Sequence, residues 1–220
     1  NQIYGLTKGQ YSPTSELGKK TKTSPMGSID YPYNPDSLAL GAEATFVART
    51  IDKDRNHMAE VLEAAADHRG TSFIEIYQNC NVFNDTAFIE LTSRESRDVN
   101  RFYLELGKPI VFGPDNEYGV RIGELGAEIV VVSVVGIDSI LVHKAEDPEP
   151  GVAFALSRIS SGPHGPTPLG IFRSVDRAVY EDLMVGHIEK AQAQRGTGDL
   201  AALVRSGGTW SAHDEASSRS

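Results

Sequence analysis

The sequence has little cysteine, no long apolar run and no excess of basic charge. A single Cys among 220 residues excludes an internal disulfide framework and is compatible with a reducing compartment. The longest apolar run, residues 129–135, is too short to cross a membrane and is typical of a buried strand. The net charge of −9 argues against a nucleic-acid partner. We therefore expect a globular cytoplasmic protein that binds neither nucleic acid nor membrane.

Several general catalytic and targeting motifs are also missing. The sequence has no phosphate-binding Gly-x-x-x-x-Gly-Lys-Ser/Thr loop and no Gly-x-Ser-x-Gly nucleophile turn. Its six His residues show no metal-ligand spacing, and no signal peptide is visible. Any catalytic or ligand-binding site must therefore be sought in motifs that are specific to a particular protein family.

The segment richest in ligand-binding groups is the N-terminal stretch 1–14. It brings together an amide, two glycines, a lysine and several hydroxyls before any amphipathic element begins. Glycines let backbone N–H groups approach a phosphate or carboxylate, and a lysine adds a point charge. We predict an anion-binding loop here, with Lys8, between Thr7 and Gly9, as a functional residue.

Basic charge is concentrated at the same end of the chain. Residues 1–22 carry a net charge of +3, whereas the remaining residues carry −12. A basic segment on an acidic body is what an anionic ligand would favour. A solvated lysine cluster explains Lys19, Lys20 and Lys22 equally well, so both interpretations stay open for these three residues.

The pattern between residues 36 and 77 predicts a helix followed by a strand–helix–strand unit. The expected elements are a helix over 36–43, a strand over 45–50, a helix over 53–68 with Asp52 as its N-cap, and a strand over 71–77. Such a succession indicates a parallel βαβ unit, which binds ligands near the carboxyl ends of its strands. Cys80 falls just past such an end, where we expect a functional residue. A buried structural Cys is the alternative.

The second half of the chain reads differently. We predict short helices in 85–106, short strands at 110–112, 120–122, 129–135 and 140–142, a helix over 152–159, a loop over 160–168, an amphipathic helix over 177–195 and a short helix over 200–204. The expected organisation is therefore a ligand-binding domain over 1–106, an α+β extension over 107–206 and a disordered tail over 207–220.

Two segments carry a specific resemblance to a known family. They are Asn1-Gln2-Ile3-Tyr4-Gly5-Leu6-Thr7-Lys8-Gly9-Gln10-Tyr11-Ser12-Pro13-Thr14 and Gln78-Asn79-Cys80-Asn81-Val82-Phe83-Asn84. They resemble the β subunits of 2-oxoacid:ferredoxin oxidoreductases, and above all the 2-oxoglutarate type. Supporting segments are Ser24–Gly27, Asn34-Pro35 with Leu38–Ala42, Phe73–Tyr77, Ala153–Arg158 and Pro168–Val175. The resemblance covers nearly all of the chain up to about Trp210.

Two motifs of that family are absent from this sequence. Neither Gly-Asp-Gly nor Cys-x-x-Cys occurs, although the family has both before the point that matches Asn1. We therefore expect this chain to be the C-terminal part of a longer subunit. The resemblance implies an α/β fold: a thiamine-diphosphate-binding domain of the pyrophosphate type with a mostly parallel sheet, shortened at its N-terminal side, plus a C-terminal extension.

The resemblance also implies cofactors. Thiamine diphosphate would be bound by Asn1, Ile3, Tyr4, Gly5, Leu6 and Thr7, with Gly5 and Gly9 letting the loop backbone pass close to it. Asn1, through its amide oxygen, and Ile3, through its main-chain carbonyl, would ligate the Mg²⁺ that holds the diphosphate. The third protein ligand in the family, the Asp of Gly-Asp-Gly, is not in this sequence.

Two further residues receive roles from the resemblance. Cys80 matches the fourth ligand of a [4Fe–4S] cluster whose other three ligands lie in the missing region. Lys8 matches the position that can pair with the distal carboxylate of 2-oxoglutarate. Contact with the cofactor diphosphate is the alternative for Lys8, and a structural role is the alternative for Cys80.

The implied activity needs several partners. The resemblance implies an α subunit, which supplies the Glu that activates the cofactor, together with ferredoxin, 2-oxoglutarate and CoA. The reaction would be the oxidative decarboxylation of 2-oxoglutarate to succinyl-CoA and CO₂, with electrons passing through the cluster to ferredoxin. Two alternatives stay open: a preference for pyruvate or for a broad range of 2-oxoacids, and a non-catalytic fragment with a role in assembly.

Overall fold

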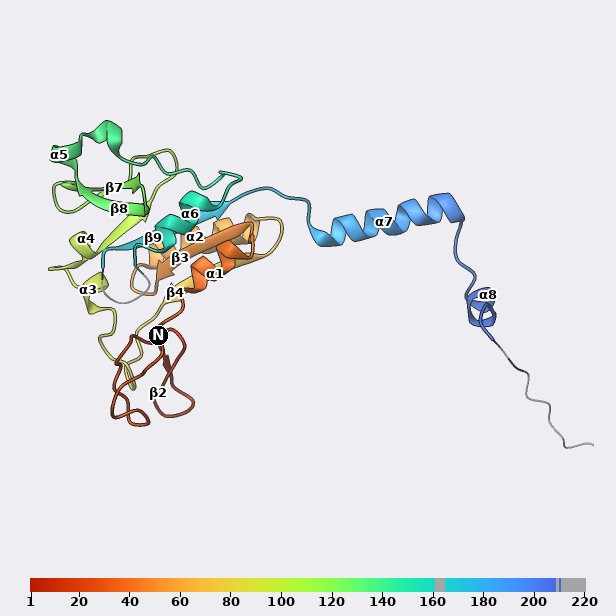
Figure 1. Ribbon diagram of the computed structural model, residues 1–220, viewed down its shortest axis with the longest axis horizontal. Coiled ribbons are helices and arrows are strands. Elements are labelled where there is room, and N and C mark those ends of the chain that lie inside the picture. Colours follow the sequence, from red (N-terminus) through yellow and green to blue (C-terminus); the bar gives the residue numbers. More distant parts are fainter. Residues whose placement is uncertain (161–164, 209, 211–220) are drawn as a thin grey trace, which may run out of the picture. The chain divides into compact units, whose positions relative to one another are not determined.

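The structure is a computed structural model that describes residues 1–160, 165–208 and 210, in two compact units, 1–177 and 178–220 (Figure 1). The elements of the first unit are β1 Ile3–Tyr4, β2 Gln10–Tyr11, α1 Pro35–Gly41, β3 Phe46–Ile51, α2 Arg55–Asp67, β4 Ser72–Tyr77, α3 Ile89–Thr92, α4 Arg97–Asn100, β5 Arg101–Leu104, β6 Val111–Phe112, β7 Tyr118–Gly123, β8 Gly126–Val131, α5 Val132–Val135, the 3₁₀ helix η1 Ile137–Ser139, α6 Gly151–Ser157 and β9 Thr167–Ser174.

The central sheet has the strand order β4-β3-β9-β5. Its β3–β4 and β5–β9 pairs are parallel, whereas β9 runs antiparallel to β3. The prediction of an α/β fold with a mostly parallel sheet is therefore confirmed. The predicted βαβ unit is β3–α2–β4, and its two strands are in register from Phe46 opposite Ser72 to Ile51 opposite Tyr77.

Strand β9 was not predicted, because Pro168 and Gly170 interrupt its strand pattern. Proline is tolerated where a strand has a neighbour on one side only. Pro168 meets this condition: it pairs with Phe102 of β5, while the last pair with β3 is at Gly170. β9 thus places a strand from the C-terminal part of the chain inside the sheet that begins with β3. The domain boundaries expected at 106 and 206 stay predictions.

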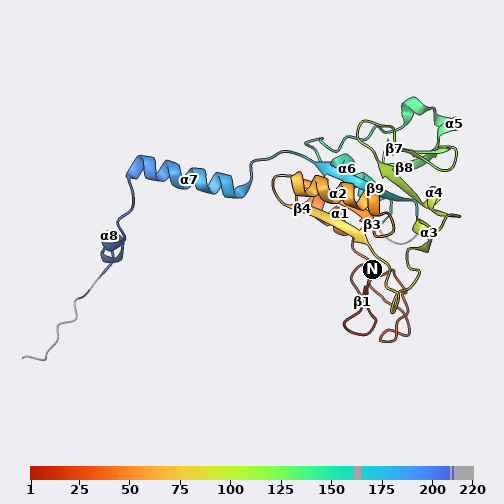
Figure 2. The ribbon, with the colours of Figure 1, turned by 180° about the vertical axis from the view of Figure 1, so that it is seen from behind.

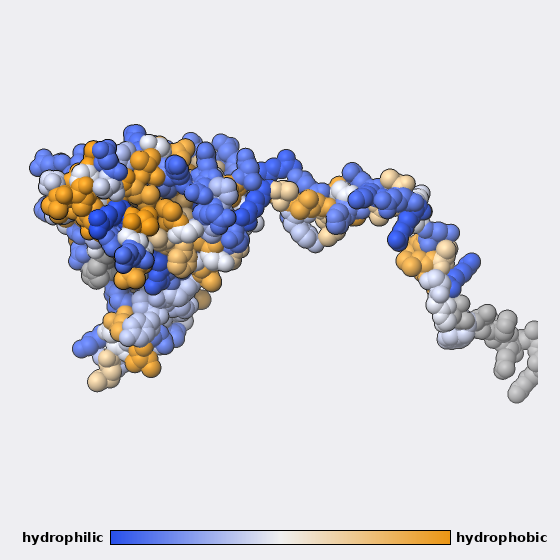
Figure 3. All heavy atoms as spheres, turned by 45° about the horizontal axis from the view of Figure 1, so that its top comes forward, coloured by the Kyte–Doolittle hydropathy of each residue, from blue (hydrophilic) through white to orange (hydrophobic). Residues whose placement is uncertain are grey.

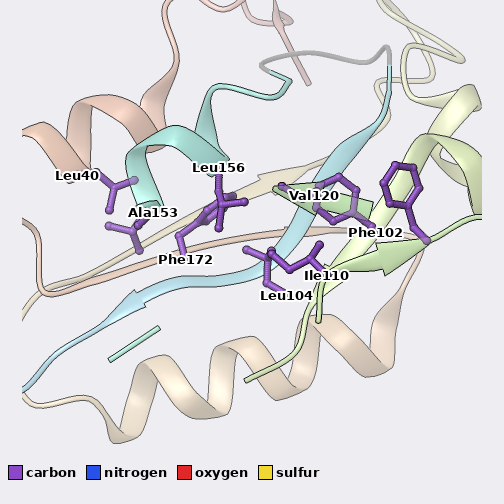
Figure 4. Packing of buried hydrophobic residues seen from close by; sticks show 10 residues of the cluster. Leu40, Phe102, Leu104, Ile110, Val120, Ala153, Leu156 and Phe172 are labelled. Atoms are coloured by element: carbon purple, nitrogen blue, oxygen red, sulfur yellow. The ribbon is translucent and has the colours of Figure 1, made fainter. Parts of the chain in front are cut away.

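Alternate residues of β3 point to opposite faces of the sheet, as strand geometry requires. Phe46 and Ala48 pack against Val61 of α2 on one face. Val47 packs on the other face, in a larger core that includes Leu40 of α1. Figure 4 shows Ala153 and Leu156 of α6 pointing toward Phe172 of β9 in this larger core. Two apolar layers therefore hold the sheet that carries the site.

Several local predictions were wrong. The N-cap of α2 is Asp54, whose carboxylate accepts from the His57 N–H, rather than Asp52. The predicted strand 129–135 ends at Val131 and continues as α5, and 140–142 contributes only an isolated bridge between Val142 and Pro109. The predicted helical segment 85–106 ends in β5, because Phe102 and Leu104 alternate into the core with strand spacing.

The second unit contains α7 Tyr180–Arg195 and α8 Leu200–Arg205. Both helices were predicted, but the amphipathic character expected of 177–195 was wrong: the apolar residues of α7 do not gather on one face, and Figure 3 shows hydrophilic and hydrophobic residues side by side along it. The tail predicted over 207–220 lies largely outside the described residues. None of the described helices is long and apolar enough to span a membrane.

Candidate functional site

The N-terminal loop, residues 1–11, forms a short hairpin. β1 and β2 pair with Ile3 opposite Tyr11, and the Gly9 N–H donates to the Tyr4 carbonyl over 3.0 Å. Lys8 and Gly9 both have positive φ, 66° and 96°, a region that an ordinary side chain rarely adopts. Ile3 is buried. The turn itself presents four exposed side chains, Tyr4, Leu6, Thr7 and Lys8. The predicted cofactor-binding residues thus combine one anchored residue with an exposed turn.

Gln2 is a candidate that the sequence did not single out. It is buried, has a positive φ of 53° and accepts a hydrogen bond from the Ser15 hydroxyl at its main-chain carbonyl. Its side-chain Oε1 is buried and has no hydrogen-bond partner in the described part of the chain. A buried amide oxygen without a partner costs free energy. It lies between Asn1 and Ile3, so the residues present fit a bound metal or polar cofactor there.

The cysteine loop, residues 78–84, follows directly after β4. Cys80 is half-buried, and its carbonyl accepts from the Asn84 N–H over 3.0 Å. Backbone N–H groups of Phe83 and Val82, with a smaller effect from Asn84, lower the pKa of the Cys80 thiol. This environment favours the thiolate, which is the metal-binding form of cysteine.

The structure brings Asn1 and the cysteine loop together, because the Asn84 side chain is hydrogen-bonded to the Asn1 carbonyl. Figures 1 and 2 both show the N-terminal loop beside the segment that follows β4. Residues predicted to serve different cofactors therefore lie in neighbouring loops.

The two loops are joined by Phe83 and Asn84. The Asn84 side-chain N–H donates to the Asn1 carbonyl over 2.9 Å. A Cβ atom at Gly9 would lie 3.0 Å from the Phe83 ring, whereas one at Gly5 would be in ordinary van der Waals contact with it. Close approach of these glycines to a cofactor stays a prediction, and the ring accounts for Gly9 alone. Sequence reasoning missed Phe83 and Asn84 as individual residues, although both lie in the segment that carries the resemblance.

The lysines of the N-terminal region differ in their surroundings. Lys19 is half-buried, and its ammonium donates to Asn84 Oδ1 over 2.6 Å and lies 3.4 Å from Glu16. Lys20 and Lys22 are exposed, as is Lys8. The contacts of Lys19 with Asn84 and Glu16 fit neither of the two interpretations left open, a ligand-binding lysine or a solvated one. Lys8 stands apart because it lies in the turn of the predicted cofactor loop.

A buried ionic cluster joins α1, β3 and β4, the strand that leads into the cysteine loop. The Arg49 guanidinium, fully buried on β3, contacts Glu75 of β4 and Asp36 of α1, each at 2.7 Å. Nη1 of Arg49 donates to the Ser160 carbonyl, and the Tyr77 ring lies 5.3 Å from its guanidinium carbon. Sequence reasoning missed this cluster, although an Arg within an otherwise apolar strand is a signal that could have indicated it. β4, which leads into the cysteine loop, is therefore tied to β3 by charge.

This cluster predicts a pH dependence of stability. Burial raises the pKa of Asp36 from 3.8 to about 8, against the opposing effect of Arg49. Because the folded-state pKa lies above the unfolded value, the stability contributed by Asp36 is full below about pH 4 and is lost as the pH rises through about 8. We expect the unfolding free energy of Asp36→Asn to fall less than that of wild type between about pH 5 and pH 8. Urea unfolding of the full-length subunit at several pH values measures this.

The matched control is Asp67→Asn, which removes an exposed carboxylate on α2 and should keep the wild-type slope. If Asp36→Asn and wild type had the same slope, the assigned role of Asp36 would be wrong.

No group of three or more His, Cys, Asp or Glu side chains that could hold a metal ion lies within residues 1–160, 165–208 and 210. Cys80 is the only cysteine of the sequence. A [4Fe–4S] cluster at Cys80 would need its other thiolates from elsewhere, and a Mg²⁺ at Asn1 and Ile3 would need phosphate oxygens and a further ligand.

Comparison with known proteins shows which families this chain is similar to. Residues 1–76 match the family model described as the C-terminal TPP binding domain of thiamine pyrophosphate enzymes. The chain is 50% identical over 212 residues to the 2-oxoglutarate oxidoreductase subunit KorB of Mycobacterium tuberculosis, covering 96% of this chain. The predicted resemblance to the β subunits of 2-oxoacid:ferredoxin oxidoreductases is confirmed. The chain spans 57% of the length of that relative.

Other relatives match a shorter part of the chain. The β subunit of the 2-oxoacid:ferredoxin oxidoreductase of Saccharolobus solfataricus is 45% identical over 85 residues, 39% of this chain and 28% of that subunit. Among solved structures, the 2-oxoglutarate:ferredoxin oxidoreductase of Magnetococcus marinus, with 2-oxoglutarate, coenzyme A and succinyl-CoA bound, superposes with a TM-score of 0.64 over 94% of this chain and 56% of that one. Its sequence identity of 23% supports the fold assignment alone.

Proposed function

We propose that this chain is part of the β subunit of a 2-oxoglutarate:ferredoxin oxidoreductase. The reaction is 2-oxoglutarate, CoA and two oxidised ferredoxins to succinyl-CoA, CO₂ and two reduced ferredoxins. The observation that carries the proposal is the contact between the N-terminal loop and the cysteine loop. The side-chain N–H of Asn84, which lies four residues after Cys80, donates to the Asn1 carbonyl over 2.9 Å. A thiamine cofactor and an iron–sulfur cluster would then lie close together, as electron transfer between them requires. The 50% identity to the 2-oxoglutarate oxidoreductase subunit KorB of Mycobacterium tuberculosis supports the substrate class.

The N-terminal loop would hold thiamine diphosphate and Mg²⁺. Asn1 would give its amide oxygen and Ile3 its main-chain carbonyl to the metal, with Tyr4, Gly5, Leu6 and Thr7 next to the cofactor. The unpartnered Oε1 of buried Gln2 supports this, because a polar cofactor or a water bound to it would satisfy that atom. When bound, thiamine diphosphate supplies the electron sink for loss of CO₂ from a 2-oxoacid.

Cys80 would be one thiolate ligand of a [4Fe–4S] cluster. The backbone N–H groups that lower its pKa would also stabilise the negative charge of a bound cluster. Electrons would leave through this cluster to ferredoxin. The complete heteromer would supply the remaining ligands of the cluster and of Mg²⁺. It would also supply the CoA site and the α subunit with its activating Glu.

The exposed Lys8 would determine the substrate. Lys8→Met should raise KM for 2-oxoglutarate by about 10- to 100-fold, because a hydrogen bond to a charged group contributes about 1.5–3 kcal/mol. KM for pyruvate, which lacks the distal carboxylate, should change by less than about threefold. Steady-state kinetics of the complete heteromer with both acids measures this.

Lys20→Met is the control, since Lys20 is exposed and lies outside the hairpin turn. An equal loss with both acids would instead indicate contact between Lys8 and the cofactor diphosphate, and no change with either would exclude both roles.

The proposal as a whole is tested by cofactor binding. Titration calorimetry should detect thiamine diphosphate binding to the complete heteromer in the presence of Mg²⁺ and not in the presence of EDTA. Binding that is absent under both conditions would favour the alternative of a non-catalytic assembly fragment.

A further inference from the structure

Asn84 uses both ends of its side-chain amide to connect the two loops. It is 6% exposed, its N–H group donates to the Asn1 carbonyl, and its Oδ1 accepts from the Lys19 ammonium. A buried amide with both groups satisfied in one geometry is a strong constraint on the chain segments that it joins. Asn84 therefore fixes the position of Asn1 relative to the cysteine loop.

Phe83 makes the second connection. A Cβ atom built at Gly9 would lie 3.0 Å from Phe83 Cδ1, and one built at Gly5 would lie 3.7 Å from Cδ2. Gly9 also has a φ of +96°, a backbone conformation that favours glycine, and a side chain there would press on the ring. The ring thus packs directly on the turn that presents Lys8.

The same two residues shape the backbone around Cys80. The Asn84 N–H donates to the Cys80 carbonyl, and Cys80 and Asn84 form an isolated bridge. A shift of the backbone at 83–84 would therefore move the surroundings of the Cys80 sulfur and the anchor of Asn1 at once.

We propose that Phe83 and Asn84 are positioning residues that couple the thiamine diphosphate site to the cluster site, so that a change in either residue alters both. The inference rests on the proposed function, because it takes Asn1 as a Mg²⁺ ligand and Cys80 as a cluster ligand. Neither residue touches the reacting atoms; each acts through the loop that it holds.

The test compares Asn84→Ala, Asn84→Asp and Phe83→Leu with wild type in the complete heteromer. Two quantities are measured: the Kd of thiamine diphosphate with Mg²⁺, by titration calorimetry, and the electron paramagnetic resonance spectrum of the reduced cluster. We expect Asn84→Ala to raise Kd by about tenfold, which corresponds to about 1.4 kcal/mol, and to shift the g-values of the cluster. Asn84→Asp keeps the acceptor for Lys19 and loses the donor to Asn1, so it should act in the same direction.

Asn81→Ala is the matched control. Asn81 is exposed, lies in the same loop beside Cys80 and accepts a hydrogen bond from the Asn79 side chain, not from the N-terminal loop. Its Kd for thiamine diphosphate should stay within about twofold of wild type. Such a result separates coupling from general damage to the cysteine loop.

The coupling is overturned if Asn84→Ala and Phe83→Leu leave both the Kd of thiamine diphosphate and the cluster spectrum unchanged, or if both variants change only one of the two. It is also overturned if Asn81→Ala is as damaging as Asn84→Ala. If Asn84→Ala fails to assemble, Phe83→Leu and Asn84→Asp decide the question in the same way. Wild-type enzyme that binds no thiamine diphosphate or holds no cluster would contradict the proposed function instead.

Discussion

Replacing Cys80 with alanine in the complete heteromer should lower ferredoxin reduction by at least about 100-fold, because one of four thiolate ligands of the cluster is lost. The iron content and the reduced-cluster resonance signal should fall together with activity. Thiamine diphosphate should still bind, since the Asn84 contact with Asn1 does not involve the sulfur. Its Kd should rise by about tenfold or less. Metal analysis, resonance spectroscopy and calorimetry on one preparation measure all three quantities.

The control for Cys80→Ala is Asn79→Ala in the same loop, which removes bonds to Asn81 and Asp85 only. It should retain iron at the wild-type level. An active Cys80→Ala enzyme with full iron content would show that this cysteine is structural, which is the alternative that its half-buried position allows.

Replacing Arg49 with methionine should have the largest effect on stability. Arg49 is fully buried between Asp36 and Glu75, so its loss leaves the Glu75 carboxylate without its counter-charge and the buried Asp36 carboxyl without its partner. Breaking a buried pair in this way costs about 3–5 kcal/mol. Urea unfolding of the full-length subunit near neutral pH measures the change in unfolding free energy. Because β4 leads into the cysteine loop, we also expect that loop to become more sensitive to proteolysis.

Arg121→Met is the control for this experiment. Arg121 of β7 pairs with Glu128 of β8 at 3.0 Å, with both side chains more than 40% exposed, and an exposed pair contributes about 0–1 kcal/mol. A loss below about 1 kcal/mol in Arg49→Met would mean that the cluster does not hold β3 and β4 together.

The parts of the fold that the sequence predicted correctly are those with strong local signals. The β3–α2–β4 unit was predicted because two β-rich segments flank a segment whose apolar residues recur with helix period. β9 was missed because Pro168 and Gly170 are tolerated only through pairing with strands distant in sequence. The amphipathic prediction for α7 was wrong because several apolar residues at helical spacing do not establish an apolar face.

Only those site residues that match a family motif could be predicted from the sequence. Asn1, Ile3, Lys8 and Cys80 could be proposed from motifs, and the structure places Asn1 beside the cysteine loop. The contacts that join the loops could not be predicted, because they connect residues 83 positions apart through a main-chain carbonyl. Every residue has a main-chain carbonyl, so the sequence does not show which carbonyl accepts a hydrogen bond.

The central claim is most directly tested by anaerobic viologen reduction with the complete β subunit co-expressed with its α partner. We would compare 2-oxoglutarate with pyruvate, each with and without CoA. The account predicts CoA-dependent reduction with 2-oxoglutarate preferred. A preference for pyruvate would contradict the substrate assignment while keeping the chemistry, and no reduction with either acid would contradict the proposed function itself.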